Sequence, residues 1–504
     1  MKRIALAGFI ALVASGCGQA PTESAPAPSS APAASVTADK VETRLGALTF
    51  ERGYPTAETT KKLFDEMDYQ RAVQAYLWAY PAVSFESIRV AAKETYGADY
   101  LDIGIADKFV DPKSIYLTAN DTTIYAFANI DLGKAGPVVV DIPPGAIVGL
   151  IDDFWQRSAS DVGLPGPHGD KGGKFLLVPP GYKGQLPAQG YEVRQATMNN
   201  YNIMVRGIVT NLDSDVPNAV ERVRKVRVYP LSEAANPKPN KFASISGTVV
   251  NTLPPAGLEF WARLSAFINN NPVQERDRFF MAMLKPLGIE KDKPFQPDER
   301  QRGILEEAAR IGDAMGRTML FDAEHRFSGA NAIRGTNWNW VLLVNPTQET
   351  ASYSQLDERL HYTYGAIYTS PGIGVMKAGP GSNYIQAFKD KDGNRLDGGK
   401  SYRLRVPPDV PAAAFWSVTL YDTAIRSMIP NPRNDSALSS YDKLKANDDR
   451  SIDLYFGPKA PPGAESNWIE TVPGKGFYPM VRFYSPKEGL FDGTWKLPDV
   501  ELTK

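Results

Sequence analysis

The stretch Phe415-Trp-Ser-Val-Thr-Leu-Tyr421 indicates the architecture of this chain most directly. Apolar residues at 416, 418 and 420 alternate with the polar Ser417 and Thr419. Alternation with a period of two places the two kinds of side chain on opposite faces of a β-strand. The stretch therefore predicts a half-buried antiparallel strand, with one face on a core and the other in solvent.

Similar strands recur on both sides of a helical region. Ser401–Val406 and Met480–Tyr484 alternate in the same way, and residues 116–206 contain further β-branched runs between turns rich in Gly and Pro. Many short strands between such turns favour a sandwich or jelly roll over a parallel α/β sheet.

Helical spacing appears in three places. Residues 46–95 predict a helix that Pro81 ends or kinks, and residues 214–225 predict a shorter helix with an early proline. Residues 256–326 are predominantly helical, with apolar residues three or four positions apart. The apolar face expected there consists of Ile304, Ala308, Ile311, Met315 and Met319.

We therefore predict a fold that is mainly β with helical segments (α+β). Two β-sandwich or jelly-roll-like domains, at residues 46–250 and 331–504, would be joined by a helical bridge at 251–330.

Cys17 is the single cysteine of the 504 residues, and it follows Ala-Ser-Gly at the end of a short apolar run. That run is too short to span a bilayer, so residues 1–16 are typical of a signal peptide. Ala14–Cys17 resembles the lipobox of bacterial lipoproteins, whose cysteine is acylated. Residues 17–45, rich in Ala, Pro and Ser, predict a disordered tether. We expect a protein lipid-anchored to the cell envelope through Cys17, in the outer membrane and facing the periplasm or exterior.

Composition excludes several functions. The net charge is −1, with 56 basic and 57 acidic residues, and without a basic stripe nucleic acid is not an expected partner. A single cysteine and three scattered histidines argue against disulfides and against a thiolate or imidazole metal site. Phosphate-loop, dinucleotide and serine-hydrolase motifs are absent. We therefore expect no metal and no cofactor.

The C-terminal motifs resemble a known bacterial family. They are Phe415–Asp422, Asn467-Trp468, Arg482–Pro486 and Asp492–Pro498, and in combination they are similar to the domain-of-unknown-function family numbered 1214. Ala119–Tyr125, Asp152–Trp155 and Arg206-Gly207 resemble its usual partner, the family numbered 1254. The resemblance implies β-sandwich-like domains in an envelope or secreted setting, and it implies no agreed activity.

Carboxylates beside aromatic residues are the candidates for catalysis. Asp121, Asp153 and Asp422 each lie next to or near Tyr, Phe or Trp, and a carboxyl group near buried aromatic surface can have a raised pKa and act as a general acid. His361 is a candidate proton carrier. The structural alternative is that the three aspartates cap turns or pair with arginines, and that His361 is a hydrogen-bonded core residue.

Aromatic and amide residues are the candidates for ligand binding, because flat rings beside amides suit sugars and other semi-polar molecules. Two arginines would orient the ligand. The set comprises Asn120, Tyr125, Trp155, Arg206, Trp338, Asn339, Tyr421, Asn467, Trp468 and Arg482, with Tyr362, Tyr364 and Tyr368 close in sequence to the tryptophan cluster. The alternative is that these residues form sandwich cores and turns.

Three functions follow from these candidates. Binding of a carbohydrate-like or small semi-polar ligand is our first expectation. The second is a glycosidase-like acid/base hydrolase that uses paired carboxylates, whose separation decides the chemistry. The third is a structural envelope protein that assembles through aromatic surfaces, with a homo-oligomer as one form.

Overall fold

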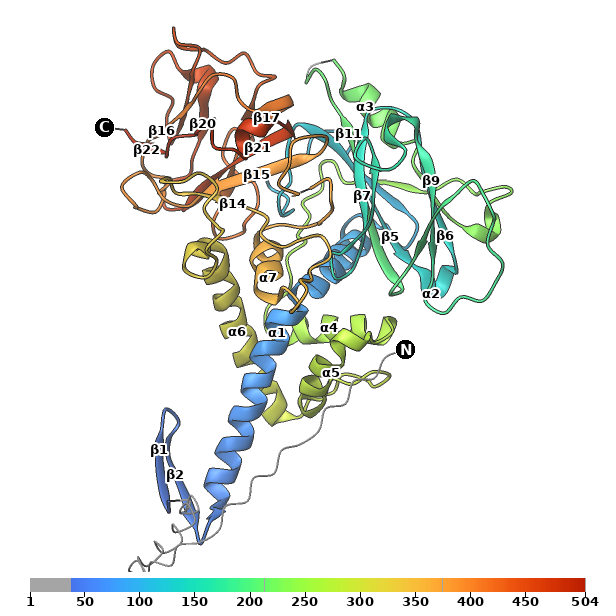
Figure 1. Ribbon diagram of the computed structural model, residues 1–504, viewed down its shortest axis with the longest axis vertical. Coiled ribbons are helices and arrows are strands. Elements are labelled where there is room, and N and C mark those ends of the chain that lie inside the picture. The colour runs from blue at the N-terminus through green and yellow to red at the C-terminus, as the bar shows by residue number, and fades with distance from the viewer. Residues whose placement is uncertain (1–37, 213, 374, 504) are drawn as a thin grey trace, which may run out of the picture. The chain divides into compact units, whose positions relative to one another are not determined.

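The computed structural model describes residues 38–212, 214–373 and 375–503 (Figure 1). The predicted signal peptide, Cys17 and most of the predicted tether lie outside the described residues. The chain divides into two compact units, Met1–Phe64 and Asp65–Lys504, which are described separately.

The first unit contains a small antiparallel sheet of β1 (Lys40–Thr43), β2 (Gly46–Glu51) and β3 (Tyr54–Pro55). The prediction of helix from residue 46 was therefore wrong up to residue 56. Gly46 and Gly53 take φ values of 84° and 83°, which glycine adopts without strain, so the chain reverses at both places. Helix α1 (Ala57–Tyr96) begins only after the third strand.

The sequence predicted that Pro81 would end or kink this helix, and helix α1 continues through Pro81 without ending. Proline removes one backbone hydrogen bond at a cost of about 3 kcal/mol. Burial offsets that cost, because residues 78–88 are almost completely buried. Side chains also bond to the helix backbone: Arg359 donates to the Trp78 carbonyl at 2.7 Å and Gln156 to the Pro81 carbonyl at 3.2 Å.

The N-terminal β region consists of two sheets that share one core, as predicted for a sandwich. A six-stranded sheet has the order β13-β4-β5-β11-β7-β8, and a four-stranded sheet has the order β10-β9-β6-β12. The strands are β4 (Ile103–Ile105), β5 (Thr123–Asp131), β6 (Val138–Ile142), β7 (Ile147–Asp153), β8 (Ser158–Gly163), β9 (Gly173–Val178), β10 (Glu192–Gln195), β11 (Asn200–Ile208), β12 (Arg227–Pro230) and β13 (Phe242–Ser244). Short helices α2 (Leu132–Ala135) and α3 (Val216–Val223) lie between them in sequence.

The C-terminal β region is a second pair of sheets around a second core. Its sheets have the orders β14-β15-β21-β17-β18 and β20-β19-β16-β22. The strands are β14 (Trp338–Trp340), β15 (Ser382–Ala387), β16 (Tyr402–Val406), β17 (Ala412–Asp422), β18 (Ala437–Ser439), β19 (Ile452–Gly457), β20 (Trp468–Glu470), β21 (Phe477–Pro486) and β22 (Glu501–Leu502). The mainly β prediction with two sandwich-like regions is confirmed.

Strand β17 is buried on both faces, so the half-buried prediction was wrong. Its apolar face, with Val418 and Leu420, enters the core between the two C-terminal sheets. Ser417 and Thr419 on the other face are also fully buried. Tyr421 on that face joins the core of the N-terminal region. The polar face therefore lies against another part of the chain instead of solvent.

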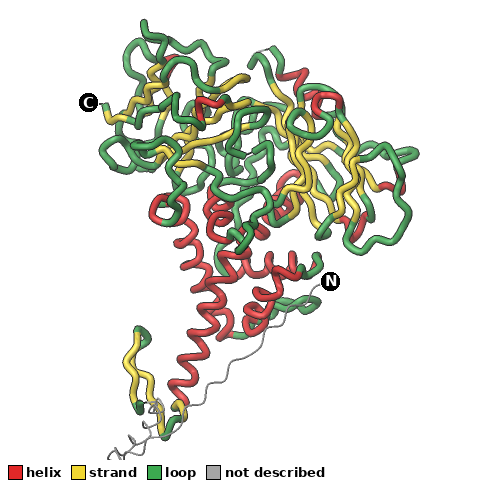
Figure 2. Tube along the Cα trace, in the orientation of Figure 1, coloured by secondary structure: helices red, strands yellow, loops and turns green. Residues whose placement is uncertain are grey.

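The predicted helical region contains α4 (Leu258–Asn270), α5 (Arg278–Leu284) and α6 (Glu299–Phe321), and α7 (Leu356–Gly365) follows β14. Figure 2 shows these helices gathered on one side of the strands. Single 3₁₀ turns occur at Gly169–Lys171, Leu231–Glu233, Glu275–Asp277, Lys285–Leu287, Ala323–His325, Glu465–Asn467 and Glu488–Leu490. Among the described residues, none of the helices combines the length and apolar character that a membrane crossing requires.

The buried face of α6 differs from the predicted one. Ile311 and Met315 are 39% and 42% exposed, while Gly312 and Gly316 are buried. A Cβ atom at Gly312 would lie 2.3 Å from the Tyr76 ring, and one at Gly316 would lie 2.5 Å from the Tyr364 ring. The two glycines therefore let aromatic rings approach the helix backbone, a face that counting large apolar residues does not reveal.

This packing predicts opposite effects for two glycine substitutions in α6. Gly312→Val should lower the free energy of unfolding by about 2 kcal/mol or more, because overpacking displaces the ring. Gly303→Ala, where nothing lies within 4 Å, should raise it by up to about 1 kcal/mol through helix propensity. Urea unfolding of both variants measures the difference, and equal effects would contradict this packing.

Candidate ligand-binding site

A cavity lies where the N-terminal six-stranded sheet approaches the C-terminal five-stranded sheet. From β5 and β11 it is lined by Tyr125, Phe127, Met204 and Arg206, and from β15 by Tyr384. Tyr125 pairs with Arg206 and Phe127 with Met204 in the antiparallel register of these strands. Because pairing partners share a face of the sheet, all four side chains reach the cavity together.

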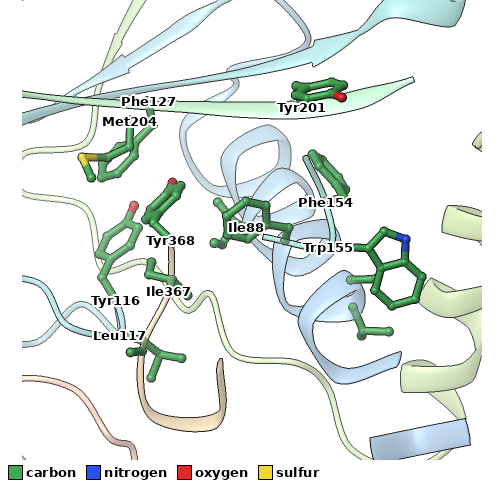
Figure 3. Close-up of a cluster of buried hydrophobic side chains, with 14 of the residues drawn as sticks. Ile88, Tyr116, Leu117, Phe127, Phe154, Trp155, Tyr201, Met204, Ile367 and Tyr368 are labelled. Carbon is green, nitrogen blue, oxygen red and sulfur yellow. The ribbon is translucent and has the colours of Figure 1, made fainter. Parts of the chain in front are cut away.

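Two connecting segments complete the walls. Residues 116–119 form one side, and Tyr362, Ile367, Tyr368 and Ile373 form another. Figure 3 shows Tyr116, Ile367 and Tyr368 near Phe127 and Met204. The space inside measures about 40 Å³. A single water needs roughly 10–15 Å³ on this measure, so the cavity holds a group of only a few non-hydrogen atoms.

Hydrogen bonds hold the tyrosines of the lining in place. Tyr362 donates to the Tyr368 carbonyl at 2.5 Å, and the Tyr368 hydroxyl donates to Asn202 Oδ1 at 2.6 Å. Burial raises the pKa of both phenols well above the usual range. These hydroxyls therefore stay protonated near neutral pH.

Asn120 is fully used by the fold. Its Oδ1 accepts hydrogen bonds from Thr122 and Thr123, and its Nδ2 donates to the hydroxyls of Tyr125 at 2.8 Å and Tyr484 at 3.3 Å. Asn120 therefore orients Tyr125 at the cavity and does not line it.

Arg482 supports the wall at residues 118–119. Its Nη2 donates to the carbonyls of Thr118 at 2.7 Å and Ala119 at 3.0 Å, and also to the hydroxyl of Tyr421. The Tyr421 hydroxyl in turn donates to the Ala119 carbonyl at 2.6 Å. The guanidinium also lies 5.4 Å from the centre of the Tyr384 ring. Arg482 and Tyr421 thus position the lining.

Arg206 differs from Arg482, because it lines the cavity itself. It is 3% exposed, and its Nε has no hydrogen-bond partner. Its guanidinium lies 6.0 Å from the centre of the Tyr484 ring. Burial acts to lower the pKa of Arg206, but Tyr384, Tyr125 and Tyr484 act to raise it and the net direction is upward. Arg206 is therefore a buried cation.

Asp121 borders a larger open cleft of about 480 Å³, whose wall shares Val110 with the cavity. Its Oδ1 is buried without a partner. Burial, with the nearby Asp435 adding to it, raises the pKa of Asp121 to about 6.

Asp153 and Asp422 shape turns at strand ends. Asp153 Oδ1 accepts from the backbone N–H of Trp155 at 2.9 Å, and its Oδ2 pairs with Arg157 at 2.7 Å. Asp422 accepts from the N–H of Ala424 at 2.7 Å and pairs with Lys475 at 2.9 Å. Asp153 lines a different cleft from Asp121, and Asp422 lines neither of the two.

His361, Trp155 and Trp338 are core residues. His361 is fully buried, its Nδ1 bonds to the Met319 carbonyl at 2.9 Å, and burial lowers its pKa. The Trp155 ring lies 4.7 Å from that of Trp78. Trp338 belongs to the second core and donates to the Pro498 carbonyl at 2.9 Å.

Asn339, Asn467 and Trp468 lie in the C-terminal region away from the cavity. Asn339 is buried on β14. Asn467 donates to the carbonyls of Lys445 and Asp453, and Trp468 donates to the Gly457 carbonyl. Of the sequence-predicted ligand residues, the structure thus brings together Asn120, Tyr125, Arg206, Tyr421 and Arg482.

Sequence reasoning missed Met204, Tyr384 and Tyr484. The alternation of side chains along β21 could have identified Tyr484, because it lies two residues from Arg482 and so shares the same face of the strand. Tyr384 pairs with Arg482 across β15 and β21. That pairing joins residues almost one hundred positions apart and cannot be read from local pattern.

One carboxylate–imidazole cluster has metal-like proximity: ligand atoms of Asp322, Glu324 and His325 lie within 4.8 Å of one another. Lys389 already pairs with Glu324 at 2.5 Å, and Arg395 pairs with Asp322 at 2.6 Å. Because these cations neutralise both carboxylates, the cluster is better suited to ion pairing than to holding a metal.

Two family models match the chain, one in each of the two β regions that line the cavity. The family model DUF1254, a protein of unknown function, matches residues 102–230, and DUF1214, also of unknown function, matches residues 381–488. The chain carries both of these domains. The DUF1254 domain supplies Tyr125 and Arg206 to the cavity, and the DUF1214 domain supplies Tyr384 and its supporting Arg482.

The chain is similar to two solved structures, of which the first shares its fold. The VPA0106 protein from Vibrio parahaemolyticus is 20% identical, with a TM-score of 0.54, and the match covers 87% of this chain and 100% of that one. An uncharacterised protein from Burkholderia cenocepacia is 13% identical, with a TM-score of 0.39, and the match covers 89% of this chain and 96% of that one. No curated protein matches the sequence.

The raised pKa of Asp121 predicts a pH-dependent effect on stability. A carboxyl whose folded pKa is about 6, against an ordinary 3.8, disfavours folding once it ionises. Asp121→Asn should therefore raise the free energy of unfolding at pH 8, by up to about 3 kcal/mol. The gain should decline as the pH falls from about 6 to 4 and vanish below that. Urea unfolding at several pH values measures it, and a gain independent of pH would contradict the assignment.

Proposed function

We propose that the chain binds a small semi-polar molecule in the cavity between its DUF1254 and DUF1214 domains. The observation that carries the proposal is the mixed lining: buried apolar side chains, several tyrosines and one arginine around a single space. Ligand sites typically combine mostly apolar walls with a few fixed polar groups. The volume of about 40 Å³ favours a small molecule over a carbohydrate ring.

The hydrolase alternative has less support. Glycoside hydrolysis needs two carboxyl groups that flank one bond. Asp121 and Asp153 line different clefts, and Asp422 is committed to a turn and to Lys475. The three aspartates therefore do not supply the pair that this mechanism requires.

The binding proposal predicts a thermal shift in the full-length chain. Short alcohols, amides, aldehydes and carboxylic acids, with monosaccharides for comparison, form the panel. One of the small classes should raise the melting temperature by a few degrees in a concentration-dependent way, because a ligand at 100 times its Kd adds about 2.7 kcal/mol. Monosaccharides should have no effect.

A matched pair of variants localises the effect. Val110→Phe places a ring beside the cavity and should abolish the shift, whereas Val249→Phe, at a position that is 61% exposed, should keep it. A panel without any shift, or a shift that survives Val110→Phe, would contradict binding in this cavity.

We also propose that lipid on Cys17 anchors the chain in the bacterial envelope, with the outer membrane as its location. The support is the lipobox-like Ala14–Cys17 and the Ala/Pro/Ser-rich segment after it. Stable anchoring needs more than one acyl chain, as lipoproteins have.

Metabolic labelling with an alkyne analogue of palmitate tests the anchor. The full-length chain should be labelled and should partition with membranes. Cys17→Ala should lose the label and the membrane association, while Ser15→Ala should keep both. Label that persists without Cys17 would refute the anchor, since the chain has no other cysteine.

A further inference from the structure

Arg206 is the only charged residue among the described residues that line the cavity. Within the described part of the chain it forms no ion pair and no hydrogen bond, and its Nε is buried without a partner. A buried charge is costly unless it is paired or hydrogen-bonded. Arg206 therefore differs from the buried Arg482 at the Nη groups: Arg482 Nε is also without a partner, but its Nη2 donates to two carbonyls and a hydroxyl.

Nearby groups do not neutralise this charge. The groups that most affect Arg206 are Tyr384, Tyr125, Tyr484 and Arg482, and none of them is a carboxylate. Asp152 on β7 is fully buried, burial raises its pKa well above the usual range, and its Oδ2 accepts a hydrogen bond from the backbone of Thr369. Asp121 faces the open cleft and not the cavity. The cavity consequently has an excess of positive charge.

A second donor lies beside Arg206. Tyr125 is its pairing partner across β5 and β11. The Tyr125 hydroxyl accepts a hydrogen bond from Asn120, and its own hydrogen has no acceptor among the described residues. Leu117, Met204 and Ile367 contribute apolar side chains to the lining. The space thus combines positive charge and hydrogen-bond donors at Arg206 and Tyr125 with apolar side chains. Further tyrosines also line it, among them Tyr116, whose buried hydroxyl has no partner.

We infer that the ligand of this cavity is a small monocarboxylate with a short apolar chain, bound through its carboxylate by Arg206 and Tyr125. The inference rests on the proposed function and specifies its ligand class. Arginine binds carboxylates through charge-assisted hydrogen bonds, which are about twice as strong as neutral ones. One unpaired guanidinium suits a single negative charge, and the apolar walls disfavour a fully hydrated anion such as inorganic phosphate.

Calorimetric titration of the full-length chain at pH 7.5 tests the inference with matched probes. Acetate, propionate and butyrate are compared with acetamide, propionamide and butyramide, which have the same shape but no charge. Inorganic phosphate serves as the control anion that has no apolar chain. At least one acid should bind tenfold or more tightly than its amide, and phosphate should not bind.

Variants of Arg206 assign the preference to its side chain. Arg206→Met should abolish the preference for the acid and, without ligand, raise the melting temperature, because a buried unpaired charge is removed. Arg405→Met, at an exposed pair with Asp449, should change neither property. A merely structural arginine would instead lower the melting temperature when replaced.

The outcomes separate this inference from the proposed function. Acids and amides that bind equally, in a manner that Val110→Phe abolishes, would overturn the carboxylate inference and leave binding in the cavity intact. A preference for the acid that survives Arg206→Met would overturn it as well. Absence of binding by either series would overturn both.

Discussion

The arrangement of the two β regions depends on the hydrogen bonds of the Arg482 guanidinium. It extends from β21, the central strand of the C-terminal sheet, to the carbonyls of Thr118 and Ala119 in the N-terminal region. Hydrogen bonds from a charged donor are worth about 1.5–3 kcal/mol each, and a buried donor left unsatisfied costs as much or more. Loss of this contact would remove the side-chain donor of the Thr118 carbonyl, whereas the Ala119 carbonyl would keep its bond from the Tyr421 hydroxyl.

This contact explains why the C-terminal sheet has two unlike buried faces. Along β21, Val481 and Phe483 enter the core between the C-terminal sheets, whereas Arg482 lies on the other face. Further along that second face, Tyr478 and Met480 belong to the core of the N-terminal region. The two β regions therefore share a core, and the polar residues of β17 lie at their junction.

Sequence pattern was sufficient for the strands and the helical region, because alternation and three-or-four spacing are local. It failed where a long-range partner decides the outcome. The face predicted to be exposed at Ser417 and Thr419 is buried, and Tyr421 and Arg482 on that face bond to carbonyls of residues 118–119, hundreds of residues away in sequence. The buried face of α6 depends on glycines that admit the rings of Tyr76 and Tyr364. Asp121, Asp153 and Asp422 all have aromatic neighbours in sequence, but in the structure they do not line a common cleft.

The candidate site was predictable to a similar degree. Asn120, Tyr125, Arg206, Tyr421 and Arg482 were identified because they lie within recognisable motifs, but their convergence depends on how the two sheets face each other. Pattern alone could not separate Arg206 from Arg482, because both are arginines in buried strands. The hydrogen bonds of the Nη groups distinguish the two: Arg482 Nη2 donates to three acceptors, whereas Nε lacks a partner in both arginines.

The position of the cavity also bears on how function is divided along the chain. The lining takes Arg206 from the DUF1254 domain, Tyr384 from the DUF1214 domain, and Tyr362 and Tyr368 from the segment between the two family matches. Neither domain alone encloses the space, and the connecting segment supplies a wall that neither family model covers. The cavity therefore exists only while the two matched regions and the segment between them are in contact.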